Sequence, residues 1–174
     1  MIKKVSIAIT FGSLVLTTLW LGLYFSKEPD VGRLDAFSQV IRSEEGSIIN
    51  LRLTPSGHWR EKASLSNIDK KLVDMLVAYE DKRFMSHYGV DPIALIRATY
   101  NSLTSGSIVS GASTLTMQTV RLMHPELRER KITTKLRQML EALRLERHFT
   151  KEEILEAYFS LAPYGGNIEG VEAA

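Results

Sequence analysis

The chain has 174 residues, of which 44% are hydrophobic and 24% are charged, a composition typical of a folded chain rather than a disordered one. This length suits one domain and leaves no room for a second catalytic domain, and a net charge of +2 is too small to indicate a general nucleic-acid binder. Because cysteine is absent, the sequence excludes disulfides, cysteine-ligated metal sites and a cysteine nucleophile.

An uncharged N-terminal run predicts a membrane anchor. Residues 5–25 carry no charge and suffice for a helix to cross ~30 Å of hydrocarbon. Two lysines precede the run and Trp20 and Tyr24 lie near its far end, an arrangement that places the N-terminus in the cytoplasm. We therefore expect a cytoplasmic stub over residues 1–4, one inner-membrane helix over residues 5–25, and the rest of the chain in the periplasm or outside. The alternative is a cleaved signal peptide, but no small-x-small cleavage site follows the run.

A linker and a small hairpin are expected after this run. Residues 26–36 contain a proline, a glycine and charges of both signs, as juxtamembrane linkers do. Apolar positions in residues 40–53 flank a glycine-containing loop, which predicts a β-hairpin. One domain should then occupy residues 37–174. Residues 171–174 look like the first turn of another helix, so we expect this domain to be incomplete at its C-terminus.

Beyond residue 64 the apolar spacing becomes helical, so the fold should be mainly α, in the α+β class. Ser66 is the expected N-cap of a first helix, whose apolar residues recur as far as Val77. An Asp-Pro pair at residues 91–92 should open a second helix that runs to about residue 103. Glycines and serines make residues 105–112 a loop, after which a short helix is expected.

The longest helix is expected over residues 127–148. Periodicity assigns one side of it to the core, namely Ile132, Leu136, Met139, Leu140 and Leu143. Beside them lies a polar stripe, which either leaves space for a ligand at a small alanine or is simply solvated: Lys135, Gln138, Ala142 and Glu146. Thr150 and Glu153 form a capping box that should start the last helix, and residues 163–166 should end it.

One carboxylate interrupts the apolar side of the first helix. At 100° per residue, Glu80 falls among apolar residues, where a leucine would pack. The side chain can be solvated at a frayed helix end, pair with Lys82 or Arg83, or serve proton transfer in a cleft. Its neighbour Asp81 projects from another side of the helix, so the two carboxylates need separate roles.

Four strings, in this order, carry a resemblance to a known family. Residues 80–89, EDKRFMSHYG, fit E-D-x-x-F-x-x-H-x-G at every fixed position. Residues 111–118, GASTLTMQ, resemble G-x-S-T-x-x-Q-Q, with Met117 in place of the first glutamine. Residues 134–138, TKLRQ, approximate R-K-x-x-E, and residues 151–160, KEEILEAYFS, resemble K-x-x-I-L-E-x-Y-L-N. These strings resemble the signatures of the peptidoglycan glycosyltransferases, glycosyltransferase family 51. Their residues are most similar to those of the penicillin-binding protein 1C branch.

The resemblance implies a lysozyme-like glycosyltransferase domain that joins lipid II molecules into glycan strands. The 4-hydroxyl of one sugar would attack the anomeric carbon of another with inversion, and undecaprenyl diphosphate would leave. Glu80 is then the catalytic general base. The resemblance assigns substrate binding to the following residues of the strings: Asp81, Lys82, Arg83, Phe84, His87, Gly111, Ser113, Thr114, Gln118, Lys135, Arg137 and Gln138.

The leaving diphosphate needs cations, backbone N–H groups or a divalent ion to absorb its charge. Lys135 and Arg137 are the candidate cations, and Mg²⁺ or Mn²⁺ is a possible cofactor. Ser113 could help to bind a phosphate at a helix start, or could act only as an N-cap. Gln138 stands where the family has a glutamate, and an amide can hydrogen-bond but cannot carry charge. The histidines lack the H-E-x-x-H spacing, so no structural metal site is expected.

Two other functions stay open. A truncated, inactive remnant would bind lipid II, membrane lipid or other cell-wall synthesis proteins without catalysis. A hydrolytic glycosidase would pair Glu80 with Glu141 or Glu146, although helix phase argues against Glu141. The S-x-x-K, S-D-N and K-T-G motifs are missing from these 174 residues, so we expect them to hold only the sugar-polymerising half of a penicillin-binding enzyme. No nucleic-acid partner is expected.

Overall fold

A computed structural model describes residues 22, 28–105, 111–129 and 131–174. The expected cytoplasmic stub and membrane helix lie outside the described residues, except for Gly22, and so does the middle of the expected 105–112 loop. Among the helices of the described part, none has both the length and the apolar character to cross a bilayer. The described chain is mostly helical with two small sheets, which confirms the expected mainly α class.

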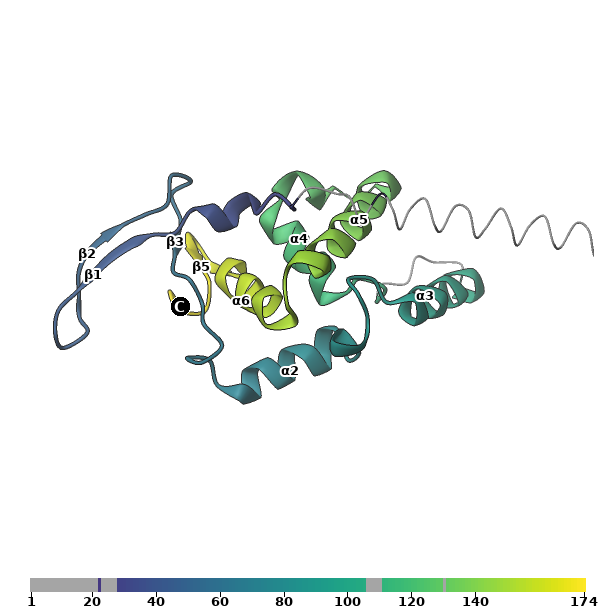
Figure 1. Ribbon diagram of the computed structural model, residues 1–174, viewed down its shortest axis with the longest axis horizontal. Helices are drawn as coiled ribbons and strands as arrows, with labels where there is room; N and C mark the ends of the chain where they lie inside the picture. The colour runs from purple at the N-terminus through teal and green to yellow at the C-terminus, as the bar shows by residue number, and fades with distance from the viewer. Residues whose placement is uncertain (1–21, 23–27, 106–110, 130) are drawn as a thin grey trace, which may run out of the picture.

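The described chain begins with a short helix and the predicted hairpin. The 3₁₀-helix η1 (Gly32–Asp35) lies within the expected linker, yet its Leu34 packs against the core, so part of this segment belongs to the folded domain. Strands β1 (Gln39–Arg42) and β2 (Ile48–Arg52) pair antiparallel, as expected. The hairpin projects away from the helices (Figure 1).

A second sheet joins distant parts of the chain. Strand β3 (Trp59–Arg60) pairs parallel with β5 (Ile168–Glu169), and β5 pairs antiparallel with β4 (Pro163–Gly165). An ion-pair cluster fastens this junction, because Glu169 accepts hydrogen bonds from Arg60 and from Arg33 of η1. The arrangement closes the N-terminal part of the domain onto its C-terminal part.

Helices α2 (Lys70–Glu80) and α3 (Pro92–Ser105) follow, with the 3₁₀-helix η2 (Phe84–Ser86) between them. The predicted cap Ser66 is wrong: the Asp69 carboxylate caps α2 by accepting from the Lys71 amide at 2.8 Å, while the Ser66 hydroxyl bonds neighbouring side chains. For α3 the prediction is confirmed, since the Asp91 carboxylate accepts from the first amides of that helix.

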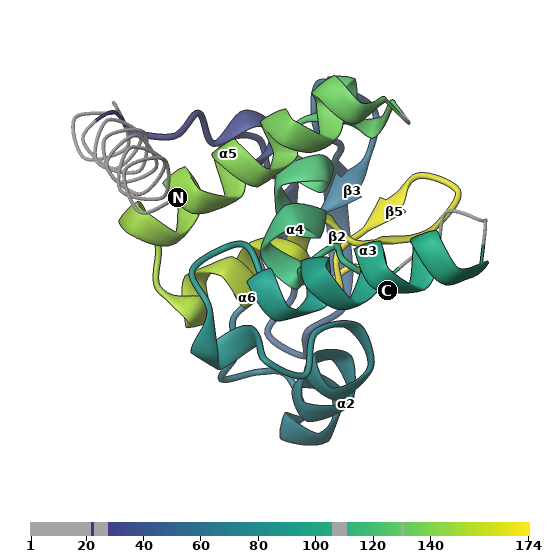
Figure 2. The ribbon, with the colours of Figure 1, turned by 90° about the vertical axis from the view of Figure 1, so that its right-hand side faces the viewer.

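Helix α4 (Leu115–Met123) lies in the centre of the helical part, with α5 and α6 packed against it (Figures 1 and 2). Most of its residues are buried, as expected for a helix surrounded by protein: Leu115, Thr116, Met117, Thr119, Val120 and Met123. The core continues into α5 and α6 through Leu145, Ile154 and Leu155.

The predicted single helix over residues 127–148 is two elements. The 3₁₀-helix η3 (Pro125–Arg128) comes first, and α5 (Ile132–His148) begins after extended backbone at its N-cap Lys131. The predicted core side of α5 is wrong in part, since Met139 packs against the core but is only partly buried. The buried residues of α5 are Thr134, Gln138, Ala142 and Leu145, whereas Ile132 is 83% and Leu136 59% exposed. Periodicity shows that a helix is two-sided, but it does not show which side the neighbouring elements cover.

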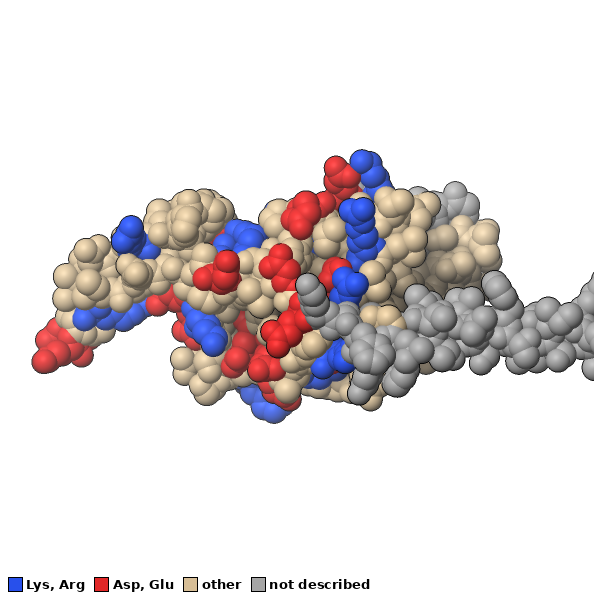
Figure 3. Space-filling view, turned by 45° about the horizontal axis from the view of Figure 1, so that its top comes forward, with Lys and Arg blue, Asp and Glu red and all other residues tan. Residues whose placement is uncertain are grey.

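Helix α6 (Lys151–Leu161) confirms the predicted capping box, because the side chains of Thr150 and Glu153 each bond the other residue's amide. Its expected end before Pro163 is also confirmed. On the face shown in Figure 3, basic and acidic side chains are interspersed, in keeping with 22 basic and 20 acidic residues in the sequence.

Candidate active site

A pocket of about 490 Å³ lies where the end of α2 meets the start of α4. It gathers residues of the first two strings that are separated by a whole helix in the sequence. Its lining consists of Tyr79, Glu80, Asp81, Lys82, Arg83, Asp91, Ala94, Arg97, Gly111, Ala112, Ser113 and Thr114. Tyr79, Asp91 and Arg97 were not predicted as site residues.

Glu80 stands on the wall of this pocket as the last residue of α2. The apolar residues one turn earlier, Leu76 and Val77, pack against the core, but the Glu80 side chain itself is exposed. Its Oε2 accepts a hydrogen bond of 2.8 Å from Nε2 of Gln118 on α4. No ion pair joins Glu80 to Lys82 or Arg83, because the Arg83 guanidinium instead pairs with Asp91 at 2.6 Å. The carboxylate is therefore directed by an amide and is open to a ligand.

Asp81 faces the protein interior. Its Oδ2 lies 2.9 Å from Nε2 of His87 and accepts a second 2.9 Å hydrogen bond from the Leu115 amide of α4. Asp81 and His87 are both buried, and the ring of Phe84 packs edge-on against the His87 imidazole. The two neighbouring carboxylates thus have separate roles, as expected: one faces the pocket and the other fixes the end of α2 to α4.

Close packing against α5 explains why the last residue of the first string is a glycine. Gly89 has a φ of +78°, and a Cβ there would lie 2.5 Å from the Ala142 carbonyl oxygen of α5. The Thr114 hydroxyl donates to the Gly89 carbonyl at 2.6 Å and accepts from the Met117 amide. Thr114, rather than Ser113, is therefore the N-cap of α4. Since the Leu115 and Met117 amides are already bonded, these two are not available to a phosphate.

Two cations lie together beside the pocket. Lys135 Nζ donates to the Ser113 hydroxyl at 2.5 Å, and Ser113 lines the pocket. Burial and the positive charge of Arg121 lower the pKa of the Lys135 amine below its ordinary value. Arg121 was missed by the sequence analysis, although its place one helical turn after Gln118 is a signal that could have indicated it. Lys135 is half-buried and Arg121 is exposed, and two positive charges that repel each other favour an anion between them.

Tyr158 of α6 is a second missed residue. Burial raises the pKa of its hydroxyl, and the negative charge of Glu80 raises it further. The positive charge of Arg121 lowers this pKa and so acts in the opposite direction. Tyr158, in the fourth string, is thus coupled by charge to Glu80 of the first string.

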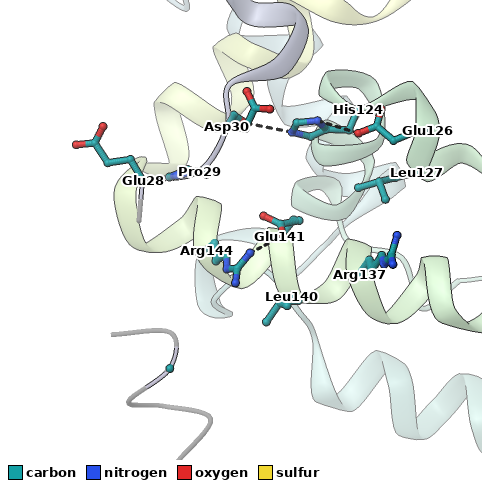
Figure 4. A pocket seen from close by; sticks show the side chains of 11 residues that line it. Glu28, Pro29, Asp30, His124, Glu126, Leu127, Arg137, Leu140, Glu141 and Arg144 are labelled. Carbon is teal, nitrogen blue, oxygen red and sulfur yellow. Dashed lines mark hydrogen bonds and ion pairs between the residues drawn. The ribbon is translucent and has the colours of Figure 1, made fainter. Parts of the chain in front are cut away.

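Four predicted site residues are not brought to the pocket. Phe84 and His87 are buried and do not line it. Gln138 is buried and its Nε2 donates to the Leu127 carbonyl at 2.5 Å, so its amide ties α5 to η3. Arg137 lines a different pocket, on another side of α5 (Figure 4). The polar stripe does not leave the predicted space, because Ala142 is fully buried beneath the Gly89 loop.

Neither candidate second carboxylate of a hydrolase lines the pocket. Glu146, whose side chain is 3% exposed, accepts from Thr116 at 2.5 Å and pairs with Lys151 at 2.6 Å. Lys151 also donates to the His87 carbonyl and lies over the Phe84 ring, so this network supports the loop after Glu80. Glu141 pairs with Arg144 in the other pocket. Neither Glu141 nor Glu146 therefore faces Glu80 as the second carboxylate of a glycosidase would.

Comparisons with known proteins agree with the strings. Residues 46–174 match the family model described as Transglycosylase. The chain is 37% identical to penicillin-binding protein 1C of Escherichia coli (strain K12) over 137 residues, which cover 79% of this chain and 18% of that protein. It is 34% identical to penicillin-binding protein 1A of Pseudomonas aeruginosa over 164 residues, which cover 88% of this chain and 19% of that protein.

A third relative extends the match along almost the whole chain. Penicillin-binding protein 1F of Bacillus subtilis is 30% identical over 186 residues, which cover 99% of this chain and 25% of that protein. The chain thus spans a quarter or less of the length of these relatives. On the family match and the identities, the chain belongs to the transglycosylase family.

Proposed function

We propose that this chain is a peptidoglycan glycosyltransferase that polymerises lipid II into glycan strands within a lysozyme-like domain. The observation that carries the proposal is the Glu80 carboxylate, which is held by Gln118 on the wall of a pocket formed by the first two family strings. Family membership supports the reaction class, and the pocket supplies a carboxylate at a place where a sugar hydroxyl can enter.

Glu80 acts as the general base in this proposal. The 4-hydroxyl of the acceptor sugar gives its proton to the carboxylate while its oxygen attacks the anomeric carbon of the donor. The new glycosidic bond forms as the bond to undecaprenyl diphosphate breaks, with inversion. Gln118 fixes the orientation of the carboxylate through its 2.8 Å hydrogen bond. A general base contributes typically 10² to 10⁴ in rate.

Lys135 and Arg121 stabilise the charge of the leaving diphosphate. Burial of Lys135 and, after it, repulsion from Arg121 lower the pKa of the lysine amine when no anion is bound. A diphosphate between them would relieve this repulsion, and the relief grows as negative charge develops on the leaving group. Ser113 links the pair to the pocket by accepting from Lys135.

A divalent cation has no preformed site in the described residues, which contain no group of three His, Cys, Asp or Glu side chains arranged for a metal. Asp81 and Asp91 line the pocket but are bonded to His87 and Arg83 respectively. The residues present therefore do not fit a resident metal ion. We propose that Mg²⁺ or Mn²⁺, where it contributes, enters with the diphosphate of the substrate.

The expected location is the outer face of the inner membrane. Residues 5–25 would anchor the chain, and the pocket would receive a substrate whose lipid tail stays in the bilayer. The partners proposed for this chain are lipid II, the growing glycan strand, membrane lipid and other cell-wall synthesis proteins.

Incubation of the purified full chain with labelled lipid II, followed by gel analysis of the products, tests the proposal. Long glycan strands from the parent and none from Glu80→Gln support it. Absence of product from both proteins would instead indicate the inactive remnant, which would still bind lipid II. Release of soluble muropeptides from finished cell wall would indicate the hydrolase.

A further inference from the structure

Helix α3 forms part of the wall of the candidate active site. Its cap Asp91 and its residues Ala94 and Arg97 line the same pocket as Glu80. The loop after α2 supplies further lining residues, among them Arg83. The shape of the pocket therefore depends on how α3 lies relative to this loop.

Packing against the core does not hold α3 along its length. Among residues 92–104, Ala94 is the single buried one. The large apolar side chains further along the helix point away from the core, since Ile96 is 70%, Tyr100 66% and Leu103 81% exposed. In Figure 1, α3 lies at one edge of the helical part, beyond α4. The helix is therefore attached to the protein through its first turn.

An ion pair fixes this first turn to the loop after α2. Arg83 donates to Oδ2 of Asp91 through both Nε, at 2.9 Å, and Nη2, at 2.6 Å. The other oxygen of Asp91 accepts from the amides of Ile93 and Ala94, at 2.9 and 3.0 Å. One carboxylate thus caps α3 with one oxygen and receives the guanidinium with the other.

Burial makes Asp91 dependent on this guanidinium. The Asp91 side chain is 7% exposed, whereas that of Arg83 is 35% exposed. Burial raises the pKa of the Asp91 carboxyl, but hydrogen bonds from the Ala94 amide and from Arg83, together with the charge of Arg83, hold the pKa below its ordinary value. If Arg83 turned towards a phosphate of the substrate, it would leave a buried carboxylate without its cation, which is strongly destabilising.

We propose that Arg83 is a positioning residue that acts through Asp91 to hold α3 as a wall of the pocket. This role differs from the direct substrate binding that the family resemblance implies for Arg83. The proposal rests on the proposed function, because the wall places the substrate relative to Glu80. When α3 turns away, the substrate still binds at Lys135 and Arg121 but is less well aligned, and a misplacement of about 1 Å can cost roughly 10²-fold in rate.

Kinetics of lipid II polymerisation by the full chain test the proposal with Arg83→Gln, Asp91→Asn and the double variant. Asparagine caps a helix as well as aspartate does, so Asp91→Asn removes the ion pair and keeps the cap. We expect each single variant to lower kcat by roughly 10-fold to 10²-fold and to change KM by less than about threefold. The double variant should lose no more than either single variant, because the two side chains act as one unit.

Two further variants serve as controls in these assays. Arg83→Lys, which keeps a charged donor for Asp91, should regain part of the rate. Arg42→Gln breaks an arginine–glutamate pair on the hairpin and should keep the parental rate. Urea unfolding curves give the folded fraction of every variant, and rates are expressed per folded molecule. A general loss of stability is thereby separated from loss of alignment.

The direction of α3 can be measured without glycosyl transfer. Because the chain has no cysteine, the exposed positions Thr99 of α3 and Glu152 of α6 can be changed to cysteine and spin-labelled selectively. Double electron–electron resonance then gives the distribution of distances between the labels. We expect this distribution to broaden in Arg83→Gln and in Asp91→Asn, and to stay unchanged in Arg42→Gln.

A raised KM in Arg83→Gln with a parental KM in Asp91→Asn would show that Arg83 binds the substrate directly, and would overturn the proposal. Additive losses of kcat in the double variant would overturn it too, as would distance distributions that stay unchanged in both single variants. If the parent makes no glycan, the proposed function fails, while the distance distributions still decide whether Arg83 holds α3 through Asp91.

Discussion

At the scale of single residues, the candidate site depends on two adjacent carboxylates in opposite environments. Glu80 is exposed on the pocket wall, whereas Asp81 is buried and accepts from two donors. Sequence reasoning predicts that the two carboxylates have separate roles, because adjacent residues on a helix project in different directions. Its placement of Glu80 on the apolar side is wrong, since Glu80 ends α2 with an exposed side chain and Asp81 is the buried one. Sequence reasoning could not predict the partners His87 and Leu115, since Leu115 comes from a different helix.

Asp81→Ala should lower the free energy of unfolding by at least ~2 kcal/mol, because it leaves the buried Leu115 amide and the buried His87 imidazole unpaired. The matched control is Asp74→Ala, which removes only an exposed pair with Lys70 on the same helix and should change stability by less than ~1 kcal/mol. Urea unfolding of the three proteins measures the difference. Equal losses in both variants would contradict the structural role assigned to Asp81.

At the scale of elements, the sequence predicts the features that are formed by residues close together in the chain. The hairpin, α3 and the capping box of α6 follow from turn residues, an Asp-Pro start and a Thr-Glu pair, all within a few residues of the element that they define. The covered side of α5 could not be predicted in this way. It is buried because α4 packs on its small and polar side, and nothing in the α5 sequence specifies that neighbour.

Alanine substitutions at two glycines test the contact between the Gly89 loop and α5. Gly89 and Gly57 share a φ of +78°, but only at Gly89 would a Cβ meet backbone, 2.5 Å from the Ala142 oxygen. Gly57→Ala should therefore cost only the ~1 to 2 kcal/mol of a left-handed backbone conformation. Gly89→Ala should cost clearly more in thermal or urea unfolding. If both variants lose the same free energy of unfolding, the Gly89 loop does not lie as close to α5 as described.

The junction of α5 and α6 depends on a buried ion pair. Lys151→Met should destabilise the fold by ~3 to 5 kcal/mol, because Glu146 would keep a buried charge with only Thr116 as a partner. Addition of Glu146→Gln to that variant should restore part of the loss, and the double-mutant cycle measures the coupling. Additive losses would show that the two side chains do not interact.

At the scale of the whole molecule, Glu169 joins the N-terminal and C-terminal parts of the domain. Burial raises the pKa of its carboxyl, but hydrogen bonds and charges from Arg33 and Arg60 outweigh this effect and hold the pKa below its ordinary value. A carboxyl with a lowered pKa in the folded state contributes stability above its unfolded pKa, and this stability is lost as pH falls through the folded pKa.

Glu169→Gln should therefore lower the urea midpoint at pH 7 and make it less sensitive to acid below about pH 4.5, the ordinary value for this carboxyl. The comparison is a series of urea unfolding curves from pH 7 downwards for the parent and the variant. Two midpoints that fall in parallel through this range would exclude Glu169 as a source of the acid sensitivity.

The structure also explains why some predicted binding residues are apart in space. Lys135 and Arg137 are neighbours in the third string, but on a helix they face different sides and so line different regions. The string resemblance gave both residues one role, because a motif records sequence order and not direction. Arg121 lies outside the four strings, yet its charge acts on Lys135 because α4, which carries Arg121, packs against α5, which carries Lys135.

The central claim is that the Glu80 carboxylate takes a proton during glycosyl transfer. The most direct measurement is the initial rate of lipid II polymerisation by the parent, by Glu80→Gln and by Glu152→Gln, which neutralises an exposed carboxylate on α6. We predict a loss of roughly 10²-fold to 10⁴-fold for Glu80→Gln, with lipid II binding retained, and a near-parental rate for Glu152→Gln. A Glu80→Gln protein that polymerises lipid II at the parental rate would contradict the account.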